Sequence, residues 1–208
     1  MVRYIRRFEE DYLLAFKCFL IATLFLPVTD LDDLHSRAFQ ARQMILSAGL
    51  TSEVREQVLK YYSELGNNVA VAVRSSATAE DLPNASFAGQ QASFLNVRGG
   101  EQVCQTVLEC LASVFTDRAI AYRVHNGFDH MDVKGAVVVQ KMVRSDIASS
   151  GVAFTLDPDT GFRDVIVLTG SYGLGESIVG GKVDPDEVQI FKPMIGKVED
   201  PIIRRKIG

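Results

Sequence analysis

The sequence is poor in cysteine and has no strong excess of charge of either sign. Its 208 residues include no tryptophan and three cysteines, Cys18, Cys104 and Cys110. An odd number of cysteines without metal-type spacing argues against both a disulfide framework and a zinc site. The formal net charge is only −4, which gives no electrostatic reason to expect a nucleic-acid surface. We therefore expect a cytoplasmic protein with reduced thiols and no nucleic-acid partner.

The sequence also lacks an apolar run long enough to span a bilayer. Residues 18–28 are uncharged and almost wholly apolar, but such a run of roughly eleven residues is too short for a transmembrane helix. Acidic residues 9–11 precede it, which does not suit a signal peptide. We interpret the run as a buried helix and expect no membrane partner. If residues 19–26 were left uncovered, we would expect self-association.

Apolar residues recur at helical spacing in three segments, which predicts helices over residues 31–49, 52–65 and 101–124. Asp30 is expected to cap the first helix, with Phe39 on its apolar face, and Ser52 the second. Val-rich runs bounded by turn residues predict strands over the following ranges: 69–73, 136–143, 149–155, 165–168 and 188–191.

The order of these elements predicts an α+β fold. Residues 1–67 are expected to form a helical N-terminal segment, and residues 68–208 a mostly antiparallel sheet with helices. The turn residues of 157–161 predict a hairpin connection. The glycine-dense segment 170–176 is expected to be a loop and not a dinucleotide fingerprint, because the strand–helix register is wrong. No closing element is expected at residues 204–208.

One stretch carries the clearest chemistry. Arg74 follows a Val-rich run and enters a series of hydroxyls and small residues, and Gly89 comes after a turn-rich segment. A guanidinium makes bidentate contacts to phosphate oxygens, and small residues let backbone N–H groups approach an anion. This order predicts a phosphate site; the alternative is an exposed arginine followed by an ordinary polar loop.

Polar residues elsewhere leave more alternatives open. Gln140 interrupts an apolar run, so its amide is expected either to bond backbone groups or to read an adenine edge. His125 and His130 are isolated in a predicted loop, and we assign them no role.

Two motifs carry a resemblance to a known family. Arg-Ser-Ser-Ala-Thr-Ala-Glu-Asp-Leu-Pro (residues 74–83) and Ala-Ser-Phe-Ala-Gly-Gln-Gln (residues 85–91) resemble the signature of the nucleotide-binding domain of the phosphoenolpyruvate synthases (pyruvate, water dikinases). Pyruvate phosphate dikinases and rifampicin phosphotransferases are related to these enzymes. Further matching blocks are residues 115–123, 127–130, 140–145, 150–155, 172–176 and 184–188.

The resemblance implies an ATP-grasp-like domain whose two lobes hold ATP with Mg²⁺. The reaction it implies is ATP + pyruvate + water to AMP + phosphoenolpyruvate + phosphate, through a phosphohistidine on another domain. It implies that Arg74 is catalytic and contacts the ATP phosphates, and that Gly89 lies in the phosphate-covering loop. Ser93 stands where relatives have a nucleotide-contacting threonine. Gln140 is implied to read the adenine, with Met142 near it in the hinge between the lobes.

The sequence departs from the family pattern at both ends. The family's Gly-Gly-Lys-Asn motif is missing, and Lys17 is no credible substitute for its lysine. The segments that hold Mg²⁺ in the family, and the domains that bind pyruvate, would lie beyond Gly208, so we assign no metal ligand. We therefore expect an incomplete domain that is inactive by itself or pairs with the rest of the enzyme. The alternatives are a rifampicin-phosphotransferase-like domain, a non-catalytic nucleotide-binding remnant and a fold without retained function.

Overall fold

The computed structural model describes residues 3–5, 30–77, 81–82, 85–86, 92–128 and 135–208, and the chain divides into two compact units, Met1–Met142 and Val143–Gly208. The apolar run at residues 18–28 and Gly89 lie outside the described residues. The expected division between residues 67 and 68 stays a prediction. The predicted fold class is confirmed at the level of an α+β protein, in which helices are followed by antiparallel sheets.

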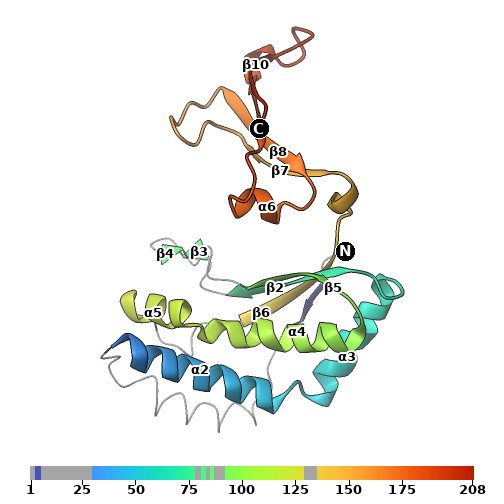
Figure 1. Cartoon of the computed structure of the whole chain (residues 1–208), viewed down its shortest axis with the longest axis vertical. Coiled ribbons are helices and arrows are strands. Elements are labelled where there is room, and N and C mark those ends of the chain that lie inside the picture. Colours follow the sequence, from blue (N-terminus) through green and yellow to red (C-terminus); the bar gives the residue numbers. More distant parts are fainter. Residues whose placement is uncertain (1–2, 6–29, 78–80, 83–84, 87–91, 129–134) are drawn as a thin grey trace. The chain divides into compact units, whose positions relative to one another are not determined.

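The first unit combines helices with an antiparallel sheet (Figure 1). Its described helical segments are α2 (Leu31–Ala48), α3 (Ser52–Leu65), α4 (Gly100–Ala112), η1 (Ser113–Phe115) and α5 (Asp117–His125). The strands, in the order β1-β6-β2-β5, are β1 (Arg3–Ile5), β6 (Gly135–Lys141), β2 (Val71–Ala77) and β5 (Ser93–Val97). A separate short pair consists of β3 (Asp81–Leu82) and β4 (Ala85–Ser86), where a loop was expected.

Local signals start and end the first two helices. Asp30 caps α2 as predicted, since its Oδ1 accepts a hydrogen bond from Asp33 N at 2.7 Å. The predicted cap of α3 is wrong by one residue, because the hydroxyl of Thr51 accepts from Val54 N and Ser52 is already helical. The prediction for Phe39 is wrong, because it is 50% exposed and the buried residues of α2 are Leu34, Ala38, Ala41 and Ile45.

The long helix predicted over residues 101–124 is interrupted. The α4 helix ends at Ala112, and Thr116 has extended backbone angles of φ −71° and ψ 155°. The Thr116 hydroxyl accepts a hydrogen bond from Ala119 N at 3.3 Å, so it caps a new helix, α5. The apolar periodicity continues across this break, which explains why it predicted one helix.

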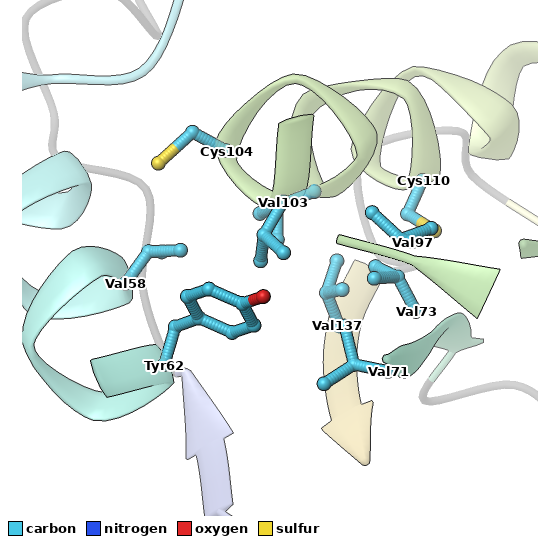
Figure 2. Packing of buried hydrophobic residues seen from close by; sticks show 10 residues of the cluster. Val58, Tyr62, Val71, Val73, Val97, Val103, Cys104, Cys110 and Val137 are labelled. Carbon is cyan, nitrogen blue, oxygen red and sulfur yellow. The ribbon is translucent and has the colours of Figure 1, made fainter. Parts of the chain in front are cut away.

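Two clusters of apolar side chains form the core of the first unit. One joins α3 and α4 to the sheet (Figure 2) and consists of Val58, Tyr62, Val71, Val73, Val97, Val103, Cys104, Val107, Cys110 and Val137. The other joins α2, α4 and α5 and consists of Leu34, Ala38, Ala41, Ile45, Leu108, Ala112, Phe115 and Ile120. The helices α2, α3, α4 and α5 therefore all lie on one side of the sheet, as Figure 1 shows.

The strands of the first unit differ from the expectation at their ends. β2 begins at Val71 and runs to Ala77, so it includes Arg74 and the hydroxyl residues that follow. β6 continues through Gln140, which pairs with Ala72, so the polar residue does not break the strand. Backbone pairing satisfies the strand's N–H and C=O groups whatever the side chain is.

The second unit is built on one antiparallel sheet in the order β10-β9-β8-β7. Its strands are β7 (Ser149–Phe154), β8 (Val165–Tyr172), β9 (Asp186–Phe191) and β10 (Ile202–Lys206). Its short helical turns are η2 (Ser145–Ile147), α6 (Glu176–Val179) and η3 (Lys192–Met194).

The second unit confirms the predicted hairpin and corrects two other expectations. The turn after β7 forms as predicted, with the Asp157 carboxylate accepting from Asp159 N and from the Thr160 hydroxyl. The expected loop at residues 170–176 is partly strand, because β8 continues to Tyr172. The end of the chain does carry an element, β10, which pairs with β9. Among the described residues, no helix has the length and apolar character needed to cross a membrane.

Candidate functional site

The sheet register of the first unit brings three of the predicted site residues to one face. Arg74 on β2 lies directly opposite Ser93 on β5 and opposite Val138 on β6. Gln140 lies opposite Ala72, two residues before Arg74 on the same strand. Paired residues, and residues two apart in a strand, point to the same side of a sheet. We call this set, Ala72, Arg74, Ser93, Val138 and Gln140, the Arg74 face.

The Arg74 face is the side of the sheet turned away from the helices. Val71 and Val73, which alternate with Ala72 and Arg74 along β2, are fully buried in the cluster with α3 and α4. Arg74 and Ser93 are exposed. The strand therefore anchors its valines in the core and presents the guanidinium beside a hydroxyl on its other side. Directly opposed residues have Cβ atoms about 5 Å apart, so one anion can contact both side chains.

The electrostatics of this face suit an anion. Within the described part of the chain, no hydrogen bond or ion pair joins the Arg74 guanidinium to another residue. The other members of the Arg74 face are apolar or neutral polar residues, and arginine stays charged at any physiological pH. A guanidinium beside a hydroxyl offers donors with the geometry that phosphate oxygens accept.

Gln140 places a primary amide on the same face. The residue is half-buried, and its side chain has no hydrogen-bond partner among the residues that the structure describes. Both alternatives for this amide, bonding to backbone groups and reading an adenine edge, therefore stay predictions. A primary amide donates and accepts in one plane, as the edge of an adenine ring requires of its partner.

The other predicted site residues, Met142 and Gly89, are not among the residues that define the Arg74 face. Met142 is half-buried, and its N–H donates to Ala70 O at 2.9 Å. It is the last residue of the first unit, so the chain passes into the second unit directly after it. Gly89 lies outside the described residues. His125, to which no role was assigned, ends α5 and is exposed.

Sequence reasoning missed the part played by Ser75. This side chain points to the core side of β2 and is only 6% exposed. Its Oγ accepts a hydrogen bond from Ala92 N at 2.8 Å, next to Ser93. The signal in the sequence was a hydroxyl one residue after Arg74, but its orientation depends on the strand extending past Arg74.

An acidic group ties two helices together away from this face. The Asp117 carboxylate accepts hydrogen bonds from His35 at 2.8 Å and from Arg42 at 3.3 Å. Partial burial raises the pKa of Asp117, but the hydrogen bonds and charges of these two partners outweigh it and hold the pKa below its ordinary value. The network links α2 to the start of α5 and has a structural role.

The second unit contains a shallow, open hollow of about 540 Å³ over β7, β8 and β9. Its floor includes Gly151 and Gly170, which are paired across the two strands, and Tyr172 and Asp186 also line it. None of the predicted site residues lines this hollow. Among the described residues there is no group of three or more His, Cys, Asp or Glu side chains that could hold a metal ion, so none of them is assigned to Mg²⁺.

Comparisons with known proteins relate the chain to a nucleotide-binding family. Residues 20–208 match the family model described as "Pyruvate phosphate dikinase, AMP/ATP-binding domain". The chain is 52% identical over 188 residues to a phosphoenolpyruvate synthase of Aquifex aeolicus, and the alignment covers 88% of this chain and 22% of that protein. It is 47% identical over 185 residues to the Helicobacter pylori phosphoenolpyruvate synthase (86% and 23%). It is 44% identical over 194 residues to a Bacillus cereus rifampicin phosphotransferase (93% and 22%). The chain therefore spans less than a quarter of the length of these relatives.

Proposed function

The chain belongs to the family of pyruvate phosphate dikinase AMP/ATP-binding domains, and we propose that its Arg74 face binds ATP. The observation that carries the proposal is the pairing of Arg74 with Ser93 on the side of the sheet away from the core. Arg74 is exposed and has no partner in the described part of the chain. A cation held on a rigid strand in this way is well placed for phosphate oxygens.

Each residue of the site has a proposed role. Arg74 contacts the ATP phosphates through its guanidinium and stabilises the charge that develops on them in phosphoryl transfer. Ser93 contributes a hydroxyl that can donate to a phosphate or ribose oxygen. Gln140 reads the adenine edge, and Met142, two residues further along the chain, contacts the base. Gly89 is proposed to lie in a loop that covers the phosphates.

For the whole protein we propose the activity of a phosphoenolpyruvate synthase-like dikinase. This chain would supply the ATP-binding part of the reaction of ATP, pyruvate and water to AMP, phosphoenolpyruvate and phosphate. The similarity to proteins named phosphoenolpyruvate synthase supports the proposal. An ATP-grasp-like fold and the use of Mg²⁺ belong to the same proposal. The free cysteines Cys104 and Cys110 support a cytoplasmic location.

A second candidate is the ATP-binding part of a rifampicin phosphotransferase, which the identity of 44% to the Bacillus cereus protein supports. The two candidates share the ATP site and differ in the acceptor. Grafting residues 20–208 into the aligned segment of each relative separates them. We expect the synthase graft to retain pyruvate-dependent ATP consumption. Activity in the rifampicin graft alone would favour the second candidate.

The ATP site is tested by isothermal titration of ATP with Mg²⁺ into the chain and its Arg74→Ala variant. Charge-assisted hydrogen bonds contribute about 1.5–3 kcal/mol, so we expect the affinity for ATP to fall roughly 10- to 100-fold. Arg118→Ala is the matched control, because it removes the same charge from an exposed position on α5. Equal affinity in Arg74→Ala, or no binding by a folded wild-type chain, would refute the proposal.

A further inference from the structure

Ser75 is a buried hydroxyl in a row of valines. On the core side of β2 it follows Val71 and Val73, and it is paired with Val137 on β6. A buried hydroxyl is costly unless it is hydrogen-bonded. Here the cost is offset at one partner residue, because Ser75 Oγ accepts from Ala92 N at 2.8 Å and donates to Ala92 O at 3.3 Å.

These bonds extend the pairing of β2 and β5 beyond its last registered pair. That pair is Arg74 with Ser93. One residue further on, Ser75 N donates to Ala92 O at 2.9 Å, so both backbone polar groups of Ala92 are bonded to Ser75. The Ser75 hydroxyl supplies the acceptor that the Ala92 N–H would otherwise lack. Ser75 thereby holds Ala92, the residue directly before Ser93, against β2. We call these bonds between Ser75 and Ala92 the clamp.

We propose that Ser75 is a positioning residue for the phosphate contacts of the Arg74 face. This inference rests on the proposed function. Ser75 points to the core, so it does not touch a ligand on the opposite face. It acts by holding Ser93 in place beside Arg74, which reduces the ordering that a bound phosphate would otherwise require. Loosening the clamp should weaken contacts to the phosphates and leave contacts to the base unchanged.

The test uses the complete chain and three serine variants. Ser75→Ala removes the clamp, and Ser75→Thr retains the hydroxyl on a β-branched residue that suits a strand. Ser113→Ala is the control, because its hydroxyl also bonds a backbone oxygen, Cys110 O at 2.6 Å, but at the end of α4 and away from the sheet. Each variant is titrated with ATP and with adenosine, which has the base and ribose but no phosphate.

We expect Ser75→Ala to lose about tenfold in affinity for ATP, which corresponds to one weakened hydrogen-bonding contact. Its affinity for adenosine should be unchanged. Ser75→Thr should restore ATP binding, and Ser113→Ala should behave as wild type. Amide hydrogen exchange at Ala92, followed by NMR, should be faster in Ser75→Ala than in wild type, because its N–H loses its acceptor.

The outcomes separate this inference from the proposed function. If wild type binds ATP, Arg74→Ala weakens binding and Ser75→Ala does not, the clamp is refuted and the ATP site stands. An equal loss for ATP and adenosine in a folded Ser75→Ala variant also refutes it. If Ser75→Ala does not fold, Ser75→Cys keeps the shape with a weaker hydrogen bond and should show a smaller loss for ATP alone. No ATP binding by wild type overturns both.

Discussion

Removing the hydroxyl of Tyr62 should destabilise the first unit, although the packing of the ring would be retained. The ring is buried among the valines of the core (Figure 2). Its hydroxyl donates to Val69 O at 2.8 Å and accepts from Gly99 N at 2.9 Å. One oxygen atom of α3 therefore holds the chain where it enters β2 and where it enters α4. Tyr62→Phe keeps the ring and removes both bonds.

The magnitude follows from the two backbone groups that the substitution leaves without a partner. A buried polar group deprived of its hydrogen bond costs about 1–3 kcal/mol. Water can reach part of the junction, since Val69 and Gly99 are only half-buried. Two such groups would cost about 2–6 kcal/mol in full. Because water reaches part of the junction, we expect Tyr62→Phe to lower the free energy of unfolding by about 2–3 kcal/mol.

The measurement is urea unfolding followed by far-UV circular dichroism, which reports mainly on the helices of the first unit. Tyr172→Phe is the matched control, because that residue is 90% exposed in the second unit and water replaces its hydroxyl contacts. A difference between the two variants of less than about 0.5 kcal/mol, the usual range for surface changes, would refute the reasoning. A changed slope with denaturant would show instead that the unfolded or native state had changed its compactness.

Two further predictions concern packing and pH. A Cβ on Gly151 would lie 2.1 Å from Thr169 O, whereas one on Gly170 would meet nothing nearer than 3.6 Å. Gly151→Ala should thus lower the melting temperature of the second unit, measured by calorimetry, clearly more than Gly170→Ala does. Equal effects of the two substitutions would contradict the close approach of β7 to β8 at Gly151. The pKa of Asp117 is held below its ordinary value of 3.8, since its two partners on α2 outweigh partial burial. The stability from this group is therefore complete above that value and is lost as pH falls through the lower folded pKa. Asp117→Asn should flatten the acid limb of a stability–pH profile, and an unchanged limb would show that the network contributes nothing.

The candidate site was only partly accessible to sequence reasoning. Arg74, Ser93 and Gln140 were chosen from a motif and a resemblance, and their roles remain proposals. Their juxtaposition follows from the pairing of β2 with β5 and β6, which joins residues far apart in the chain. The hydroxyl of Ser75 was visible in the sequence, but its orientation toward the core depends on β2 extending past Arg74 to Ala77, which the sequence pattern did not predict.

The sequence by itself determined what depends on neighbouring residues. Asp30 caps a helix because its side chain reaches an N–H three residues away, and Gly49 ends that helix with a φ of 74°. Only the tertiary structure decided what depends on distant partners. The buried face of α2 consists of Leu34, Ala38, Ala41 and Ile45, which pack with residues of α4 and α5, while Phe39 is exposed. β10 contains basic residues rather than an apolar run, and it forms because β9 offers backbone partners and Asp184 and Glu187 lie near its charges. Local chemistry sets where elements begin and end, while sheet register and packing set which side chains meet.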